Sequence, residues 1–401
     1  MASPASPVSP SATPASNAAP ATPPATPMNI VIVGGGIVGT CLAYFISISP
    51  ARPKGSTITL IEGTSVAAAA SGNAGGFLAR DWHGPATASL SAMSFDLHRK
   101  LAEQFNGSKN WGYRTVDTLS VTIDESCPPP KESRIAVPWL SREAVSASSS
   151  LGTHKTTAQV HPRLFTRFLA ERFLREPGTT LVLGTARALA LDDGHPTSIM
   201  VDLKEGGERI IDCDTIALTA GPWLGKLSSE LLPSSSARGL AVSGQMAHTL
   251  LIRTTEPTTP HCLFVDLTLT DGSVSEPEVY PRPDGTTVIC GASSDEPLPA
   301  SAAEVAAIPE MVEKLKVQAT AIAPVLGADR GAVVETTTAC FLPIPDRGRP
   351  IIGKVPGVDG VYVGGGLSCW GITQGPGVGL VLSELILEGK VVTADVSKLA
   401  P

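Results

Sequence analysis

The chain reads Ile30-Val31-Ile32-Val33-Gly34-Gly35-Gly36-Ile37-Val38-Gly39 close to its start. The β-branched residues at its beginning predict a strand. The apolar residues that follow, from Cys41 to Ile46, predict a buried helix. The glycines fall between the two, in the pattern Gly34-x-Gly36-x-x-Gly39. The sequence therefore predicts a strand, a tight turn and a helix in direct succession.

Each spaced glycine meets a steric demand of such a turn. Gly34 makes the turn itself, where a Cβ would clash. Gly36 lets a pyrophosphate approach the backbone, and Gly39 lets helix and strand pack closely. The helix N-terminus, at Ile37 and Val38, offers free N–H groups and a partial positive charge to phosphates. This pattern predicts a dinucleotide site, and an ordinary structural turn is the alternative.

The residues after the helix supply the context that the glycines need. A second predicted strand, Thr57 to Ile61, ends in Glu62, at the ~20-residue distance expected for a ribose-binding acid. A carboxylate there accepts hydrogen bonds from a ribose diol and repels a 2′-phosphate. Small residues then permit a second close backbone approach, with a flexible loop as the alternative. They are Ser71, Gly72, Asn73, Ala74, Gly75 and Gly76.

Composition limits the class of protein. A chain of 401 residues is long for one compact domain, so we expect two intertwined domains. The net charge of −7 provides no basic surface for nucleic acid or an anionic membrane, and no apolar run is long enough to span a membrane. Seven scattered cysteines form neither a CxxC pair nor a His/Cys cluster, which argues against a metal site and favours a reducing compartment. We expect a cytoplasmic protein.

Residues 1–27 differ from the rest of the chain. Apart from Met1, Val8 and Asn17 they are alanine, proline, serine or threonine, so they are expected to be disordered. They contain no arginine and no continuous apolar stretch, unlike a targeting signal. The tripeptide Ser397-Lys398-Leu399 is followed by Ala400-Pro401, which argues against a peroxisomal signal.

Periodicity predicts the remaining elements. His161 precedes Pro162 at the start of one helix and is expected to cap it. The predicted helices cover 88–105, about 162–174 and 301–323. The predicted strands cover 119–123, 180–183, 186–191, 199–203, 215–218, 240–253 and 278–293.

Together, the glycine pattern, Glu62 and the Ser71 to Gly76 loop resemble the D-amino-acid-oxidase-like FAD-dependent oxidoreductases, which include glycine oxidase, sarcosine oxidase and D-amino-acid dehydrogenase. Phe77-Leu78-Ala79-Arg80-Asp81-Trp82 and Ser368-Cys369-Trp370-Gly371 narrow the resemblance to a fungal branch. The resemblance covers roughly residues 28–398.

The resemblance implies an α/β fold in which a Rossmann-like FAD-binding domain is interleaved with an α+β substrate domain on a mixed or antiparallel sheet. We expect the FAD-binding domain at 28–118, 155–236 and 336–401, and the substrate domain at 119–154 and 237–335.

It also implies further FAD contacts. A helix N-terminus at the flavin would stabilise negative charge on the reduced ring. The implied contacts are Ala186, Ala220, Gly221, Trp223, Gly366, Ser368, Gly371, Ile372 and Thr373.

The implied reaction is hydride transfer to flavin from the CH–NH bond of a small amine or amino acid, and Arg80, Ser368 and Trp370 are the expected catalytic residues. An arginine that binds substrate carboxylate in related enzymes is replaced at Phe341 and Leu342, so Arg80, Arg282 and Arg347 become candidates for that role. A lysine that activates oxygen corresponds to Ile289, so the electron acceptor stays open. Cys340 is either a flavin attachment point or, as we prefer, an inert buried thiol.

Two other functions stay open at this point. An FAD-containing protein with a regulatory or trafficking role and little turnover is one. An NAD-only dehydrogenase is the other, but it leaves residues 71–76 and 364–373 without a role.

Overall fold

The computed structural model describes residues 26–126, 137–140 and 145–401. The expectation of a disordered segment at 1–27 therefore lies outside the described residues, apart from Thr26 and Pro27.

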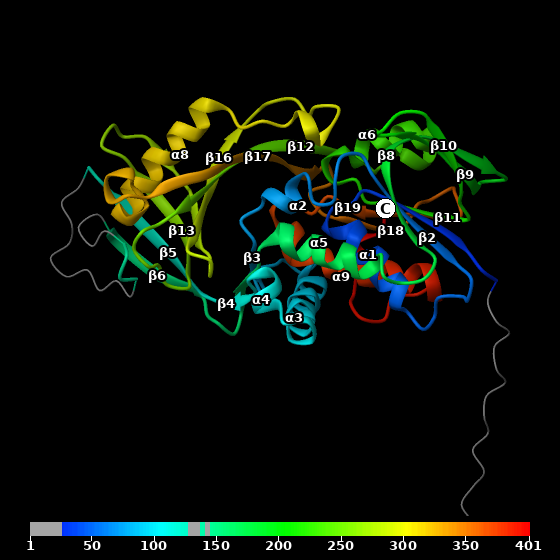
Figure 1. Ribbon diagram of the computed structural model, residues 1–401, viewed down its shortest axis with the longest axis horizontal. Coiled ribbons are helices and arrows are strands. Elements are labelled where there is room, and N and C mark those ends of the chain that lie inside the picture. Colours follow the sequence, from blue (N-terminus) through cyan, green and yellow to red (C-terminus); the bar gives the residue numbers. More distant parts are fainter. Residues whose placement is uncertain (1–25, 127–136, 141–144) are drawn as a thin grey trace, which may run out of the picture.

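Helices and runs of consecutive strands form two lobes (Figure 1). The helices are α1 (Ile37–Ile48), α2 (Ala70–Asn73), α3 (Ala88–Phe105), α4 (Gly107–Trp111), α5 (Pro162–Phe173), α6 (Leu224–Leu231), α7 (Ser234–Ala237), α8 (Pro309–Ile322) and α9 (Gly371–Glu388). The strands are β1 (Asn29–Val33), β2 (Thr57–Glu62), β3 (Phe77–Ala79), β4 (Arg114–Thr115), β5 (Asp117–Asp124), β6 (Val145–Gly152), β7 (Thr157–Gln159), β8 (Thr179–Asp192), β9 (His195–Leu203), β10 (Glu208–Asp212), β11 (Thr215–Leu218), β12 (Val242–Arg253), β13 (His261–Thr268), β14 (Val274–Ser275), β15 (Glu278–Pro281), β16 (Thr286–Ser294), β17 (Val333–Pro345), β18 (Ile351–Lys354) and β19 (Val361–Gly365).

The first lobe contains a sheet in the order β10-β9-β8-β2-β1-β11-β19-β18. Its central strands, from β8 to β19, are parallel, and Val31 pairs with Thr59 on one side and Ile216 on the other. Such strands are buried on both faces, so successive side chains of β1 point into two different hydrophobic cores. Ile30 and Ile32 face the helices α1, α3, α5 and α9, while Val31 and Val33 face α6.

The helices α1 and α9 cross closely under this sheet. A Cβ at Gly379 would lie 2.6 Å from the backbone nitrogen of Leu42 and 2.7 Å from Cβ of Cys41. The glycine therefore permits a backbone-to-backbone contact that brings the N-terminus of α9 beside the turn before α1.

The second lobe contains a sheet in the order β17-β12-β16-β15-β13-β5-β6. Most neighbours are antiparallel, and β13 and β5 are parallel. The helix α8 covers one face, where Leu315 packs in the same core as Leu250 and Ile289. The long strands β12 and β17 extend from this lobe toward the first (Figure 1).

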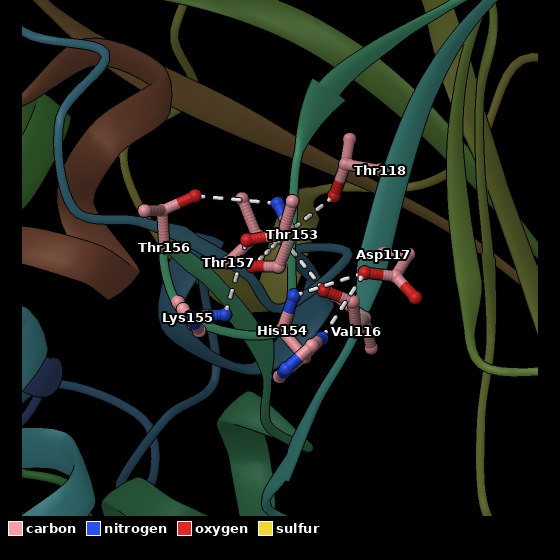
Figure 2. Close-up of polar contacts among 8 residues, drawn as sticks. All are labelled: Val116, Asp117, Thr118, Thr153, His154, Lys155, Thr156 and Thr157. Carbon is pink, nitrogen blue, oxygen red and sulfur yellow. Dashed lines mark hydrogen bonds and ion pairs between the residues drawn. The ribbon is translucent and has the colours of Figure 1, made fainter.

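A small sheet, β3-β7-β4, lies where the chain returns from the second lobe to the first. The turn between β6 and β7 is held to neighbouring strands by side-chain hydrogen bonds (Figure 2). Thr157 Oγ1 donates to the carbonyl of Val116 at 2.8 Å and accepts from Thr118 Oγ1 at 3.0 Å. The backbone N–H of His154 donates to Asp117 at 3.0 Å. These contacts fix the direction in which the chain leaves the larger sheet.

The fold class expected from the sequence is confirmed, with three local corrections. The helix expected from residue 301 begins only at Pro309, because proline is favoured in the first turn and cannot continue a helix that precedes it. The two strands expected at 180–183 and 186–191 are one strand, β8. His161 occupies the N-cap position of α5, but its side chain forms no capping hydrogen bond.

The first sheet draws its strands from residues 29–62, 179–218 and 351–365, and the second from 117–152 and 242–345. The domain boundaries themselves stay a prediction, and β17 extends across the boundary expected at residue 336.

Candidate active site

A cavity of about 590 Å³ lies between the two sheets. Its lining combines the turn after β1, the loop around α2, the segment from β19 into α9, and strands of the second sheet. This volume is in the range of sites for small molecules and cofactors.

The glycine turn has the geometry that the sequence predicts. Gly34 has φ +114°, and a Cβ there would lie 2.5 Å from the carbonyl oxygen of Thr219. A Cβ at Gly39 would lie 2.0 Å from the carbonyl oxygen of Gly34. Gly36 instead lines the cavity, and its Cβ would meet only Ser71 Oγ, at 3.1 Å. Gly34 and Gly39 thus serve the fold, whereas Gly36 keeps the turn open toward the cavity.

Glu62 ends β2 at one end of the cavity. Its Oε2 accepts from the N–H of Gly35 at 2.8 Å, and its Oε1 accepts from the N–H and hydroxyl of Thr64 at 2.8 and 2.9 Å. Thr185 and Arg187 of β8 line the same end, and Arg187 forms an ion pair with Asp202 at 2.6 Å. The carboxylate is held in place with acceptor capacity left for hydroxyl groups of a ligand.

The small-residue loop is fixed on both sides of the cavity. Ser71 Oγ accepts from the N–H of Ile37 at 2.9 Å, which joins the loop to the glycine turn. Asn73 Oδ1 accepts from Arg163 at 2.5 Å, and its amide donates to the carbonyl of Ala339 in β17 at 3.4 Å. Ala74 and Gly75, which follow, line the cavity.

The N-terminus of α9 also meets the cavity. The 3-10 turn Ser368–Trp370 precedes it, with Ser368 at φ +49°. Buried α3 side chains hold the first turn of α9: His98 Nε2 donates to the carbonyl of Ile372 at 2.8 Å, and Ser94 Oγ donates to that of Thr373 at 2.6 Å. Burial lowers the pKa of His98 to about 4, so the ring is neutral near pH 7. The positive end of this 18-residue helix is thereby held against the cavity.

Most of the expected cofactor contacts come together here. The predicted residues that line the cavity are Gly34, Gly36, Ile37, Val38, Glu62, Ser71, Asn73, Ala74, Gly75, Ala186, Ala220, Gly221, Trp223, Gly366, Ser368, Gly371 and Ile372. Gly39, Gly72, Gly76 and Thr373 are not in the described lining. Gly72 and Gly76 each allow a close backbone approach behind the cavity lining. A Cβ at Gly72 would lie 2.0 Å from the carbonyl oxygen of Ala67, and a Cβ at Gly76 would lie 2.0 Å from that of Val160.

Of the three expected catalytic residues, Ser368 lines the cavity, while Arg80 and Trp370 lie outside its described lining. Arg80 forms an ion pair with Asp96 at 3.1 Å. The Trp370 ring packs against His83 at a centroid distance of 4.4 Å.

The other two arginines proposed for carboxylate binding are also engaged elsewhere. Arg282 is buried behind the small-residue loop, where it donates to the carbonyl of Gly75 at 3.4 Å. Arg347 donates to the carbonyl of Ala400 at 2.8 Å. The structure therefore does not bring Arg80, Arg282 or Arg347 to the described wall of the cavity.

The interpretation of Ile289 needs a correction. Strand side chains alternate between faces, and that of Ile289 is fully buried under α8, in the same core as Leu315. Its neighbour Cys290 faces the cavity. A charge at position 289 would therefore enter the apolar core, and this position cannot explain how the protein selects an electron acceptor.

The second sheet contributes cavity residues that the sequence did not single out, because one polar residue in a strand forms no motif. Glu278 of β15 and Thr249 of β12 are the polar ones. Cys340 also lines the cavity, and burial raises its pKa to about 12. A neutral thiol of this kind agrees with an inert role.

The family described as FAD dependent oxidoreductase, DAO, matches residues 29–385. The chain belongs to this family of FAD-dependent oxidoreductases. FAD is therefore its cofactor, and the open glycine turn, the held acid and the cavity volume fit a flavin dinucleotide.

Similar sequences occur in two yeasts. A protein of Schizosaccharomyces pombe named as an oxidoreductase is 35% identical over 389 residues, covering 93% of this chain and 97% of the relative. The Saccharomyces cerevisiae protein TDA3, also named as an oxidoreductase, is 26% identical and covers 93% and 94%.

Solved structures share the DAO fold at low sequence identity. Glycine oxidase from Bacillus cereus has a TM-score of 0.72 at 18% identity, covering 93% of this chain and 98% of that one. L-proline dehydrogenase from P. horikoshii has a TM-score of 0.74 at 17% identity, covering 94% and 97%. Iminodiacetate oxidase from Chelativorans sp. BNC1 has a TM-score of 0.71 at 20% identity, covering 93% and 99%.

Within the described part of the chain, none of the helices has the length and apolar character needed to cross a membrane.

Proposed function

We propose that this DAO-family protein oxidises the CH–NH bond of a small amine or amino acid by hydride transfer to FAD. The observation that carries the proposal is one continuous cavity, which joins a dinucleotide-type turn at Gly34 and Gly36 to a wall of side chains from the second sheet. Structural relatives named for glycine, L-proline and iminodiacetate support a nitrogen-containing substrate.

Each part of the cavity then has a role toward FAD. The pyrophosphate would lie against Gly36, Ile37 and Ser71, and the adenosine ribose against Glu62. When bound, FAD supplies the hydride acceptor. The N-terminal end of α9, at Gly371 and Ile372, stabilises negative charge beside it.

The remaining wall belongs to the substrate in this proposal. The strands β12, β15, β16 and β17 present Thr249, Glu278, Cys290 and Leu342 to the cavity. These side chains exclude water and orient a small molecule against the cofactor. In this proposal segments 119–154 and 237–335 form the substrate domain, and 28–118, 155–236 and 336–401 hold FAD. The strand β17 crosses this boundary, so Leu342 lies on the substrate wall although it falls in the last FAD-binding segment.

We also propose a cytoplasmic location with non-covalent FAD. Cysteines kept as thiols suit a reducing compartment, and the six described cysteines are free.

The test of the function is anaerobic flavin reduction. FAD-loaded protein is mixed with a panel of amines and amino acids, and loss of the flavin absorbance is followed. Bleaching by at least one member, with release of the matching carbonyl compound, is expected. A protein that retains FAD but is reduced by no member of a broad panel would contradict the proposal.

A further inference from the structure

Glu278 places a carboxylate in the cavity wall without a cation beside it. The residue is half-buried at the start of β15, and its side chain faces the space shared with Cys290 and Ser368. Among the described residues, no lysine, arginine or histidine forms an ion pair with Glu278.

Neutral groups hold the carboxylate in position. Its Oε2 accepts from the Tyr280 hydroxyl and from the Cys290 thiol at 3.6 Å. Tyr280 is buried, and its ring stacks on Phe77 at 5.7 Å with an interplanar angle of 3°. The phenol and thiol therefore orient Glu278 but leave its negative charge unmatched.

The positive charges of the cavity lining belong to other partners. Arg187 pairs with Asp202 at 2.6 Å, and Lys226 pairs with Glu230 at 3.6 Å. Arg187 lies on the first sheet and Lys226 on α6, so neither belongs to the wall that the second sheet supplies.

This arrangement is the reverse of a carboxylate-binding pocket. An isolated charge away from water is costly unless a partner of opposite charge is present, so an anionic wall favours a cationic ligand and disfavours an anion. Burial also raises the pKa of Glu278, which makes the carboxylate a stronger proton acceptor.

We propose that Glu278 binds the protonated amine of the substrate and takes a proton from it. The inference rests on the proposed amine oxidation and narrows its substrate class to primary and secondary amines whose recognition needs no carboxylate. In the step, an N–H bond of the ammonium breaks, its electron pair stays on nitrogen, and the proton forms an O–H bond with the Glu278 carboxylate. The neutral amine that results can lose hydride from its α-carbon.

Three probes without an α-hydrogen separate recognition from turnover, because they bind but cannot be oxidised. tert-Butylamine carries only a cationic group, pivalate only an anionic group, and 2-aminoisobutyrate carries both. Each is titrated into the FAD-loaded protein, and its Kd is measured from the change in flavin absorbance and by calorimetry.

The wild type is expected to bind tert-butylamine, to bind 2-aminoisobutyrate no more tightly, and to bind pivalate at least about tenfold more weakly. Glu278→Gln keeps the size of the side chain and an acceptor for Tyr280, and should weaken tert-butylamine binding by about 10- to 100-fold. Glu278→Asp should retain part of the affinity. Glu276→Gln, at an exposed position outside the described cavity lining, is the matched control and should leave the Kd unchanged.

The pH dependence supplies a second measurement. Tyr280 of β15, Cys290 of β16, Cys262 of β13 and Cys369 of the Ser368–Trp370 turn are the titratable groups near Glu278. Burial raises the pKa of each, so all four stay neutral in acid. Affinity for tert-butylamine should fall as Glu278 is protonated at low pH, and Glu278→Gln should remove this fall.

The outcomes separate the inference from the proposed function. If the protein holds FAD and is reduced by amines, but Glu278→Gln binds tert-butylamine as well as the wild type does, the inference is wrong and the function stands. Tight binding of pivalate, with 2-aminoisobutyrate far tighter than tert-butylamine, would also overturn it. If no member of a broad amine panel reduces the bound flavin, the proposed function falls and takes the inference with it.

Discussion

Gly36 and Gly39 stand three residues apart, but a side chain would act differently at each. At Gly39 a Cβ would collide with the backbone of Gly34, which is part of the fold itself. At Gly36 it would project toward the cavity and meet only Ser71 Oγ. The turn itself therefore needs a glycine at position 39, whereas a ligand in the cavity needs one at position 36.

We expect Gly36→Val to abolish FAD retention while the protein stays folded, because its branched side chain occupies the pyrophosphate position. Gly39→Ala should instead lower the melting temperature of the flavin-free protein. Flavin absorbance of the purified variants and thermal unfolding by circular dichroism distinguish the two effects. Full flavin occupancy in Gly36→Val would show that the turn does not hold the pyrophosphate.

Glu62→Ala should weaken FAD binding by about 1.5–3 kcal/mol, the usual effect of losing hydrogen bonds to a charged group. The carboxylate also anchors the N–H of Gly35 and of Thr64, so Glu62→Gln, which keeps one of the two acceptor oxygens, should lose less. The Kd of the flavin-free protein for added FAD measures both. An unchanged Kd in Glu62→Ala would remove the acid from the cofactor site.

At the scale of elements, α3 supports the N-terminal turn of α9 through a buried neutral histidine. The hydrogen bond from His98 to the carbonyl of Ile372 persists only while the neutral ring stays in the core. The alternation of side chains along β16 explains the correction at Ile289. Ile289 and Cys290 are neighbours in the strand and point to opposite faces, so Ile289 lies in the core and Cys290 at the cavity.

The free energy of unfolding should fall as the pH decreases from about 6.5 to about 4. Burial lowers the pKa of His98 from 6.5 to about 4, so between these values the unfolded chain binds a proton that the folded chain does not. Stability is fully present above pH 6.5 and is lost on the acid side, by up to roughly 3 kcal/mol from this group.

His98→Gln, which keeps a donor for the carbonyl of Ile372, should reduce that pH dependence in urea unfolding experiments. His195→Gln, at an exposed histidine whose contact with Asp359 lies at the surface, should change it far less. Identical pH slopes in His98→Gln and the wild type would contradict the assignment.

Ile289→Lys should destabilise the protein by several kcal/mol, because it buries an unpaired charge in the core between β16 and α8. Cys290→Ser, on the opposite face of the same strand, should cost much less. Urea unfolding of both variants tests which face of β16 each side chain occupies. A stable Ile289→Lys protein with altered flavin reoxidation would instead show that position 289 corresponds to the oxygen-activating lysine.

At the scale of the whole molecule, the cavity exists only because the two lobes meet. Local patterns predicted the first sheet well, since the glycine turn, Glu62 and the strand at 215–218 each contain their own signal. The sequence did not predict that Glu278 lies in the opposite, polar wall. It also predicted wrongly that Ile289 takes the position of a residue beside the flavin. Which face a residue of β15 or β16 presents depends on pairing with strands far away in the sequence, so no local pattern encodes it.

Added FAD should therefore raise the melting temperature of the flavin-free protein as one cooperative transition. A ligand at 100 times its Kd contributes about 2.7 kcal/mol to the folded state. Differential scanning fluorimetry with and without FAD measures the shift, and Gly36→Val is the control that should show none. Separate transitions for the two lobes, with only one of them moved by FAD, would argue against a shared cavity.

The interleaved order of the strands also has a consequence during protein synthesis. The first sheet starts with β1 at Asn29 and is completed by β19 at Gly365, while the second needs β17, which ends at Pro345. Neither sheet can close until more than four-fifths of the chain has left the ribosome. The nascent polypeptide consequently carries unpaired strand edges through most of its translation, and protection by chaperones matters more here than for a protein whose domains emerge one after the other.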